Sequence, residues 1–167
     1  MPRWSSRLLP VLLAGIGLLI AGCGGSVSSS TGAPGGKLQV AAAENFWGSV
    51  AAQLGGSKVA VSSIIVNPNT DPHSYEATAS DGVTMARSQM AIVNGIGYDT
   101  WASKLLAANS SSGRAVLDVG NLLGLKEGDN PHQWYSPSSV QRVISRFISD
   151  VRLAWPHWRR ARSPSPM

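Results

Sequence analysis

Histidines are the residues of this 167-residue chain best suited to bind a metal, and each of the three directly follows a proline. His73 lies in the stretch 71–76 (DPHSYE), and His132 lies in 130–134 (NPHQW). Both have Asp or Asn before the proline and an aromatic residue two positions after the histidine. Because proline fixes φ, it stiffens the loop that carries the imidazole. Two converging neutral imidazoles are the start of a Zn²⁺ or Mn²⁺ site.

Polar neighbours offer a way to hold each ring in one orientation. A metal-bound imidazole usually donates its other ring N–H to a carboxylate, a carbonyl oxygen or water. Asp71, Glu76 and Asn130 are therefore candidates for residues that support the ligands. His157 shares the Pro-His dipeptide but lies among arginines near the C-terminus, and we treat that likeness as chance.

Other interpretations of the histidines stay open at this point. A histidine in a loop is commonly a surface or hydrogen-bonding residue. A secreted zinc hydrolase also uses histidine ligands, but it needs a third ligand and a general base. The chain has no His-Glu-x-x-His motif, and Glu76 is the nearest candidate base. A lipid-anchored interaction module is a third interpretation. We expect a binding protein and not an enzyme.

Apolar stretches alternate with helical patterns along the body of the chain. The expected strands are 38–43, 59–66, 90–94 and 115–119, and the expected helices are 45–54, 79–88, 98–108 and 138–150. Continuous apolar strands in this alternation predict an α/β fold, with a parallel sheet of about four strands covered by helices on both faces. Ligands of such sheets bind at the carboxyl ends of the strands, and both Pro-His loops follow a strand.

Local signals place the ends of these elements. Asn45 and Ser138 are expected to cap the helices that follow them, and the glycines at 55–56 are expected to end the first helix. The stretch 95–97 (GIG) lacks the third glycine of a dinucleotide-binding fingerprint, so it indicates a tight turn.

Residues at the first strand end and three tryptophans complete the predicted site region. Glu44 and Asn45 either line the cleft or serve as structural caps. Trp47, Trp101 and Trp134 are expected to pack in the core, and Trp134 could also shield a metal from water.

The N-terminus has the features of a secretion signal. Residues 1–22 contain a short positive segment and a 14-residue uncharged stretch, which is too short to span a bilayer. Small residues precede Cys23, the only cysteine, as in a bacterial lipobox. We expect Cys23 to carry the lipid anchor; the alternative is an ordinary signal peptide with an incidental cysteine. Residues 23–36 predict a flexible tether, which places the body outside the cytoplasmic membrane, anchored to its outer face.

Charge is concentrated at the two ends of the chain. The formal net charge is +5, but residues 23–150 contain 8 basic and 9 acidic residues. The central body therefore lacks the basic surface that a nucleic-acid backbone requires.

Residues 151–167 carry four arginines and no acidic residue. This abrupt change indicates a reading-frame change or a truncation after the helix 138–150; the alternative is a natural basic tail at the membrane surface.

Several motifs in one order resemble the metal-binding solute-binding proteins of bacterial zinc and manganese ABC importers, the cluster A-I family. The similar segments are 71–76, 94–99 (NGIGYD) with the residues that follow it, and 130–134. The likeness runs from about residue 37 to residue 150.

The resemblance implies a two-lobed periplasmic-binding-protein-like fold with metal in the cleft between its lobes. His73 and His132 would then be the ligands of the N-terminal lobe, here 37–137, and 138–150 would begin the helix between the lobes. It also implies a membrane permease as partner and Zn²⁺ or Mn²⁺ as the transported ligand. The second lobe is missing from the sequence, so we expect a truncated form with an incomplete site.

Overall fold

Four parallel strands form the sheet of the computed structural model, which describes residues 36–154. They are β1 (Leu38–Glu44), β2 (Val59–Ile65), β3 (Met90–Val93) and β4 (Ala115–Asp118), in the spatial order β2-β1-β3-β4. The helices are α1 (Asn45–Gly55), α2 (Ala79–Arg87), α3 (Thr100–Ala108), α4 (Val119–Leu123) and α5 (Pro137–Ala154), with 3-10 turns η1 (Gly56–Lys58) and η2 (Gln133–Tyr135). The predicted α/β class and the parallel sheet of four strands are confirmed.

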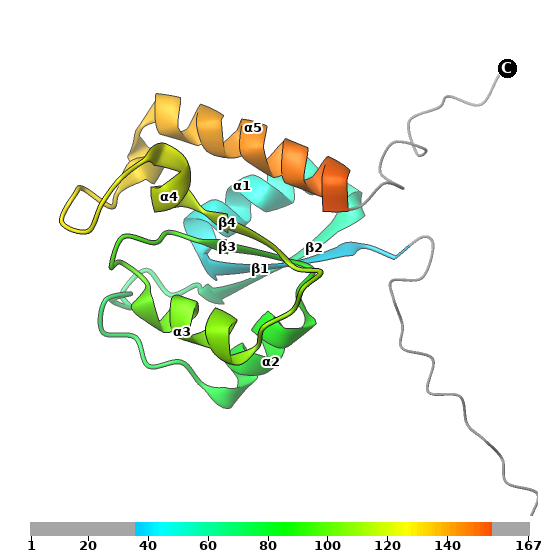
Figure 1. Ribbon diagram of the computed structural model, residues 1–167, viewed down its shortest axis with the longest axis horizontal. Coiled ribbons are helices and arrows are strands. Elements are labelled where there is room, and N and C mark those ends of the chain that lie inside the picture. Colours follow the sequence, from blue (N-terminus) through cyan, green and yellow to red (C-terminus); the bar gives the residue numbers. More distant parts are fainter. Residues whose placement is uncertain (1–35, 155–167) are drawn as a thin grey trace, which may run out of the picture. The chain divides into compact units, whose positions relative to one another are not determined.

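Helices cover both faces of the sheet, with α1, α4 and α5 on one side and α2 and α3 on the other (Figure 1). Alternate strand residues point to opposite faces, so each face has its own core. Val40, Met90 and Ile92 pack with residues of α1 and α5. Ala41 and Ala91 pack on the opposite face against Met85 of α2, where their small side chains let the helices lie close.

The strand order places a topological switch between β1 and β3. The chain leaves β1 through α1 toward β2 and leaves β3 through α3 toward β4, so the connections diverge on either side of this pair. Crevices at the carboxyl ends of such strands are the usual ligand sites of open α/β sheets. Glu44 ends β1, and the 94–99 turn follows β3.

Two predicted helix caps are wrong. Helix α1 already begins at Asn45, whose Nδ2 donates to the Val66 carbonyl at 3.5 Å, and Glu44 occupies the cap position without a side-chain bond. Helix α5 begins at Pro137, and the Ser136 hydroxyl accepts from the Ser139 amide at 3.4 Å. The proline suits the first helical position because it lacks an N–H that would otherwise need a partner.

The last helix runs past the boundary predicted for it at residue 150. It continues to Ala154, and Val151 is buried in the same core as Val143 and Phe147. The first residues of the predicted basic tail therefore belong to the folded body.

No helix within residues 36–154 is long and apolar enough to cross a membrane. Cys23, His157 and the rest of the predicted signal, tether and tail lie outside the described residues.

Candidate metal site

The two Pro-His loops both contact Tyr98 at the carboxyl edge of the sheet. The ring centroids of His73 and Tyr98 are 4.8 Å apart, and those of Tyr98 and His132 are 5.8 Å apart, both in edge-on contacts. Both imidazoles are exposed to solvent, whereas Tyr98 is buried. Two residues 59 positions apart in the sequence thus contact the same tyrosine ring, and their joint binding of a metal stays a prediction.

A carboxylate orients the first imidazole. Asp71 Oδ1 accepts from both the backbone N–H and the Nδ1 of His73, each at 3.0 Å, and Asp71 Oδ2 accepts from the Ser74 hydroxyl. These hydrogen bonds, the one to the His73 side chain above all, lower the pKa of Asp71, so the carboxylate is ionised and can only accept. In the neutral imidazole of His73 the proton therefore lies on Nδ1, which leaves the lone pair of Nε2 for a ligand.

An amide oxygen does the same for the second imidazole. Asn130 Oδ1 accepts from the backbone N–H of His132 at 2.9 Å, which identifies this atom as the oxygen. The same oxygen lies 2.9 Å from Nδ1 of His132, so that nitrogen carries the proton. In the neutral ring, Nε2 of His132 therefore carries no proton and its lone pair can bind a metal. Both rings thus offer the same nitrogen, in the tautomer that a metal-binding histidine needs.

Asn94 connects the second loop to the sheet. Its Nδ2 donates to the Pro131 carbonyl at 3.2 Å, and its Oδ1 accepts from the buried Trp47 indole at 2.9 Å. Tyr75 anchors the first loop. Its ring packs against that of Trp101 with a centroid distance of 4.8 Å, and its hydroxyl donates a hydrogen bond to Asp81. These contacts join each loop to elements far from it in sequence.

The turn at 94–99 has the unusual backbone that its glycines permit. Residues 95–97 have positive φ angles of 76°, 48° and 83°, the middle one at Ile96. The backbone amides of Asn94 and Gly95 donate to the Asp99 carboxylate at 2.7 and 2.8 Å. The tight turn predicted for this stretch is confirmed, and it is followed by Tyr98, whose ring contacts both imidazoles.

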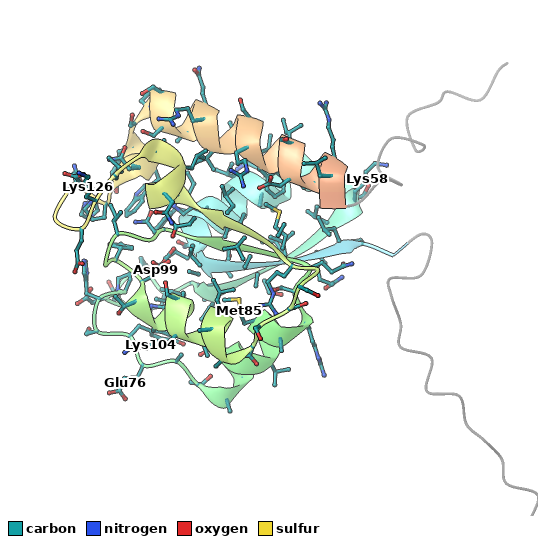
Figure 2. The ribbon with its side chains drawn as sticks, viewed as in Figure 1. Lys58, Glu76, Met85, Asp99, Lys104 and Lys126 are labelled. Atoms are coloured by element: carbon teal, nitrogen blue, oxygen red, sulfur yellow. The ribbon has the colours of Figure 1, made fainter. Side chains whose placement is uncertain are left out.

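A buried carboxyl lies beneath this turn. Glu44 is 1% exposed, and neither of its oxygens has a hydrogen-bond partner. Burial, together with the nearby Asp99 charge, raises the pKa of Glu44 to about 9, so the side chain is protonated and neutral at pH 7. Burial also raises the pKa of Asp99, against the opposing effect of its two amide donors. Figure 2 shows Asp99 inside the body, between the sheet and α3.

Tyr98 shares this environment. Burial, and then the negative charges that Glu44, Asp71 and Asp99 carry at the high pH where a phenol titrates, raise the pKa of Tyr98 to about 12. Its phenol is therefore neutral throughout the physiological range. The Tyr98 ring packs against both imidazoles.

An aromatic hollow of about 220 Å³ adjoins the two loops. Glu44 and Asn45 line it, which was one of the two roles considered for them. Its other lining residues include Asn67, Pro68, Thr70, Pro72, Phe46, Tyr98 and Trp134. The Trp134 ring stacks on that of Phe46 with their centroids 3.7 Å apart. It also makes an edge-on contact with the His132 ring, with a centroid distance of 5.1 Å. Trp47 and Trp101 are buried, so the predicted packing of the tryptophans is confirmed.

Glu76 does not join the predicted cluster. Its side chain is exposed on the outer surface (Figure 2) and forms no hydrogen bond or ion pair among the described residues. Residues 36–154 contain no group of three or more His, Cys, Asp or Glu side chains placed to hold a metal. The described body thus brings two matched imidazole donors together.

Sequence reasoning missed three contributors to the site. Asn94 and Tyr98 belong to the segment 94–99 that resembles the family, and to an expected strand end and helix start, but neither was predicted to contact the histidine loops. The charge state of Glu44 had no sequence signal. Asn94 and Tyr98 bracket the glycines of the 95–97 turn, and this turn is the one feature that could have pointed to them.

Comparison with known proteins gives a consistent family assignment. Residues 40–151 match the family described as ZnuA, zinc-uptake complex component A periplasmic. The chain is 28% identical over 141 residues to the manganese-binding lipoprotein MntA of Halalkalibacterium halodurans, covering 81% of this chain and 46% of that protein. It is 32% identical over 158 residues to the manganese ABC transporter substrate-binding lipoprotein ScaA of Streptococcus gordonii, covering 84% and 50%.

The solved structures agree in fold. The periplasmic zinc-binding protein TroA of Treponema pallidum superposes with a TM-score of 0.64 at 21% identity, over 75% of this chain and 47% of that one. The chain spans about half the length of the curated relatives it matches. Since the family match covers 112 of the 167 residues and the solved fold agrees, the chain belongs to the family of the periplasmic zinc-uptake component A.

Proposed function

We propose that this chain captures a divalent transition metal, Zn²⁺ or Mn²⁺, outside the cytoplasmic membrane for an ABC importer. One observation carries the proposal: the rings of His73 and His132 both contact Tyr98, and Nδ1 of each lies within hydrogen-bond distance of an oxygen from its own loop. The family and the names of its relatives support the same function.

The two imidazoles are the proposed metal ligands, and Asp71 and Asn130 orient them. Each orienting oxygen also accepts from the backbone N–H of its histidine, so ring and backbone are held by one atom. Imidazole nitrogen suits Zn²⁺ well and also binds Mn²⁺, so these donors leave both metals as candidates. The relatives named above are described as binding manganese or zinc.

A metal titration of the full chain tests the proposal. Calorimetry with Zn²⁺ and with Mn²⁺ should give binding that His73→Ala and His132→Ala each abolish. Asp71→Ala and Asn130→Ala should weaken binding by roughly 10–100-fold, because the ring loses its orienting partner. His157→Ala is the matched control and should leave the isotherm unchanged. An isotherm unaffected by His73→Ala and His132→Ala contradicts the assignment.

The proposed location depends on Cys23. Two of the relatives are described as lipoproteins, and the residues before Cys23 resemble a lipobox. We propose that a lipid on Cys23 anchors the protein to the outer face of the membrane, where a permease receives the metal. Radiolabelled fatty acid should be incorporated into the wild-type chain and not into Cys23→Ser. Equal labelling of both chains rules out this anchor.

A zinc-dependent hydrolase is the alternative function, and it has less support. Glu76, its candidate base, is exposed and forms no metal-binding group with the two imidazoles among the described residues, and the relatives named above are described by binding or transport. No observation favours hydrolysis over binding.

A further inference from the structure

Asn94, the residue directly after β3, is buried and bonded to four separate parts of the fold. Its backbone N–H donates to the Asp99 carboxylate at 2.7 Å, and its backbone carbonyl accepts from the Gly120 amide at 2.9 Å. Its side chain bonds to Trp47 on α1 and to Pro131 in the second histidine loop. Because Asn94 is only 1% exposed, water cannot readily replace these partners.

We propose that Asn94 is a positioning residue for metal binding: its side-chain amide holds the loop of His132 and thereby sets how tightly His132 binds zinc. This inference rests on the proposed function, because zinc binding is one of its two readouts. It adds a buried residue that supplies no ligand and that acts on only one of the two histidines.

The orientation of the Asn94 amide follows from its two partners. The Trp47 indole N–H can only donate, so the side-chain atom 2.9 Å from it is Oδ1. Nδ2 then lies 3.2 Å from the Pro131 carbonyl, which can only accept. A flipped amide would set oxygen against oxygen at one end and N–H against N–H at the other. Asn94 therefore presents a donor to the loop in one defined direction.

The bond to Pro131 acts on the peptide group that leads into His132. The Pro131 carbonyl and the His132 N–H belong to one planar unit. Asn94 holds the carbonyl end of this unit, and Asn130 Oδ1 accepts from its N–H end at 2.9 Å. The bond from Asn130 stays within the loop, whereas the bond from Asn94 joins residues 37 positions apart. Asn94 thus ties the backbone of the ligand residue to the end of β3.

The first histidine loop has no counterpart of Asn94 among the residues that the structure describes. The hydrogen bonds of the Asp71 carboxylate stay within that loop, and the Tyr75 hydroxyl donates to a residue only six positions later. Loss of the Asn94 amide should therefore loosen His132 and leave His73 in place. Global destabilisation of the fold would not separate the two histidines in this way.

A second side chain also links the His132 loop to the rest of the fold. Gln133 Oε1 accepts from the Ser139 hydroxyl on α5 at 2.7 Å, and Gln133 Nε2 donates to the Asn130 carbonyl at 2.8 Å. Gln133 is half-buried, so water can take the place of a lost partner there. We therefore expect Ser139→Ala to disturb His132 less than loss of the Asn94 amide does.

NMR of the metal-free full chain tests the positioning without any zinc. In Asn94→Leu the backbone amides of His132 and Gln133 should exchange faster with solvent and the His132 ring signals should shift, while the His73 signals stay at their wild-type values. Asn94→Ser is a second variant that keeps a small polar residue; its hydroxyl is too short to reach the Pro131 carbonyl, so it should act in the same way.

Asn109→Leu is the matched control, because its Nδ2 also donates to a backbone carbonyl, that of Leu105 at 2.9 Å, but on α3. It should leave the signals of both histidines and the zinc affinity unchanged. Calorimetry with Zn²⁺ should show about 10–100-fold weaker binding for Asn94→Leu and Asn94→Ser, as for other residues that orient a metal ligand.

Three results would overturn the positioning role and leave the proposed function standing. They are wild-type zinc affinity in both Asn94 variants, equal disturbance of His73 and His132, and a larger loss of affinity in Ser139→Ala than in Asn94→Leu. Zinc binding that is unchanged in His132→Ala overturns the proposed function instead. The metal-free NMR comparison still decides whether Asn94 holds the loop.

Discussion

Replacing Glu44 by glutamine should flatten the pH dependence of the protein's stability. Folding raises the pKa of this carboxyl from 4.5 to about 9, because the side chain is buried beside Asp99. Between these values the unfolded chain has released the proton while the folded chain keeps it. The free energy of unfolding therefore falls as pH rises through this window, and the stabilisation is fully present only below the unfolded pKa.

The structure sets the size of the effect. One proton retained only by the folded state gives a slope of about 1.4 kcal/mol per pH unit. Across the whole interval this amounts to roughly 6 kcal/mol, undiminished by solvent screening because Glu44 is only 1% exposed. Glu44 and Asp99 titrate as a coupled pair, so the slope above neutral pH is the quantity to compare.

Urea unfolding followed by tryptophan fluorescence, from about pH 5 to about pH 9, measures this slope. The Glu44→Gln chain has no proton to lose at this position, so its stability should vary less with pH than that of the wild type. Glu76→Gln removes an equal formal charge at an exposed position and should keep the wild-type slope. Parallel curves for the wild type and Glu44→Gln would refute the reasoning.

Three other substitutions test the packing around the imidazoles. Trp47→Phe leaves the buried Asn94 Oδ1 without its indole donor and should lower the free energy of unfolding by about 1–3 kcal/mol, measured by urea denaturation. Gly120→Ala places a methyl group against the Ile96 side chain and should lower the free energy of unfolding by about 1–3 kcal/mol in the same assay. An unchanged free energy of unfolding would show that the turn shifts to make room for the methyl group. Tyr98→Leu should weaken zinc binding and Tyr98→Phe should preserve it, because the ring and not the hydroxyl contacts both imidazoles; equal calorimetric affinities for all three chains would exclude a positioning role.

The sheet could be predicted because its strands are short, continuous and apolar. Buried parallel strands need no alternation, so a stretch such as 90–94 stands out from the polar loops. Helix ends were harder, because a side chain that can cap can also bond elsewhere. Asn45 bonds to Val66 across the sheet edge, and Ser136 rather than Ser138 accepts at the start of α5.

The end of α5 shows how composition can mislead. Phe147 and Val151 lie one helical turn apart, and both are buried in the core. Their spacing continues the period of the helix across residue 150. The boundary was placed there because arginine and tryptophan become frequent afterward, yet burial follows the period of the apolar residues and not the average composition.

Orientation and convergence of the imidazoles have different origins, and this explains which part of the site the sequence could show. Each ring is oriented by a residue two positions earlier, so the motif is short and can be recognised along the chain. Convergence depends on Tyr98 and Asn94, which meet the histidine loops only after the sheet brings β3 beside β1. A local motif can therefore be intact in a chain whose imidazoles never meet. The fold, and not either local motif, therefore brings the two histidine loops to the same region of the protein.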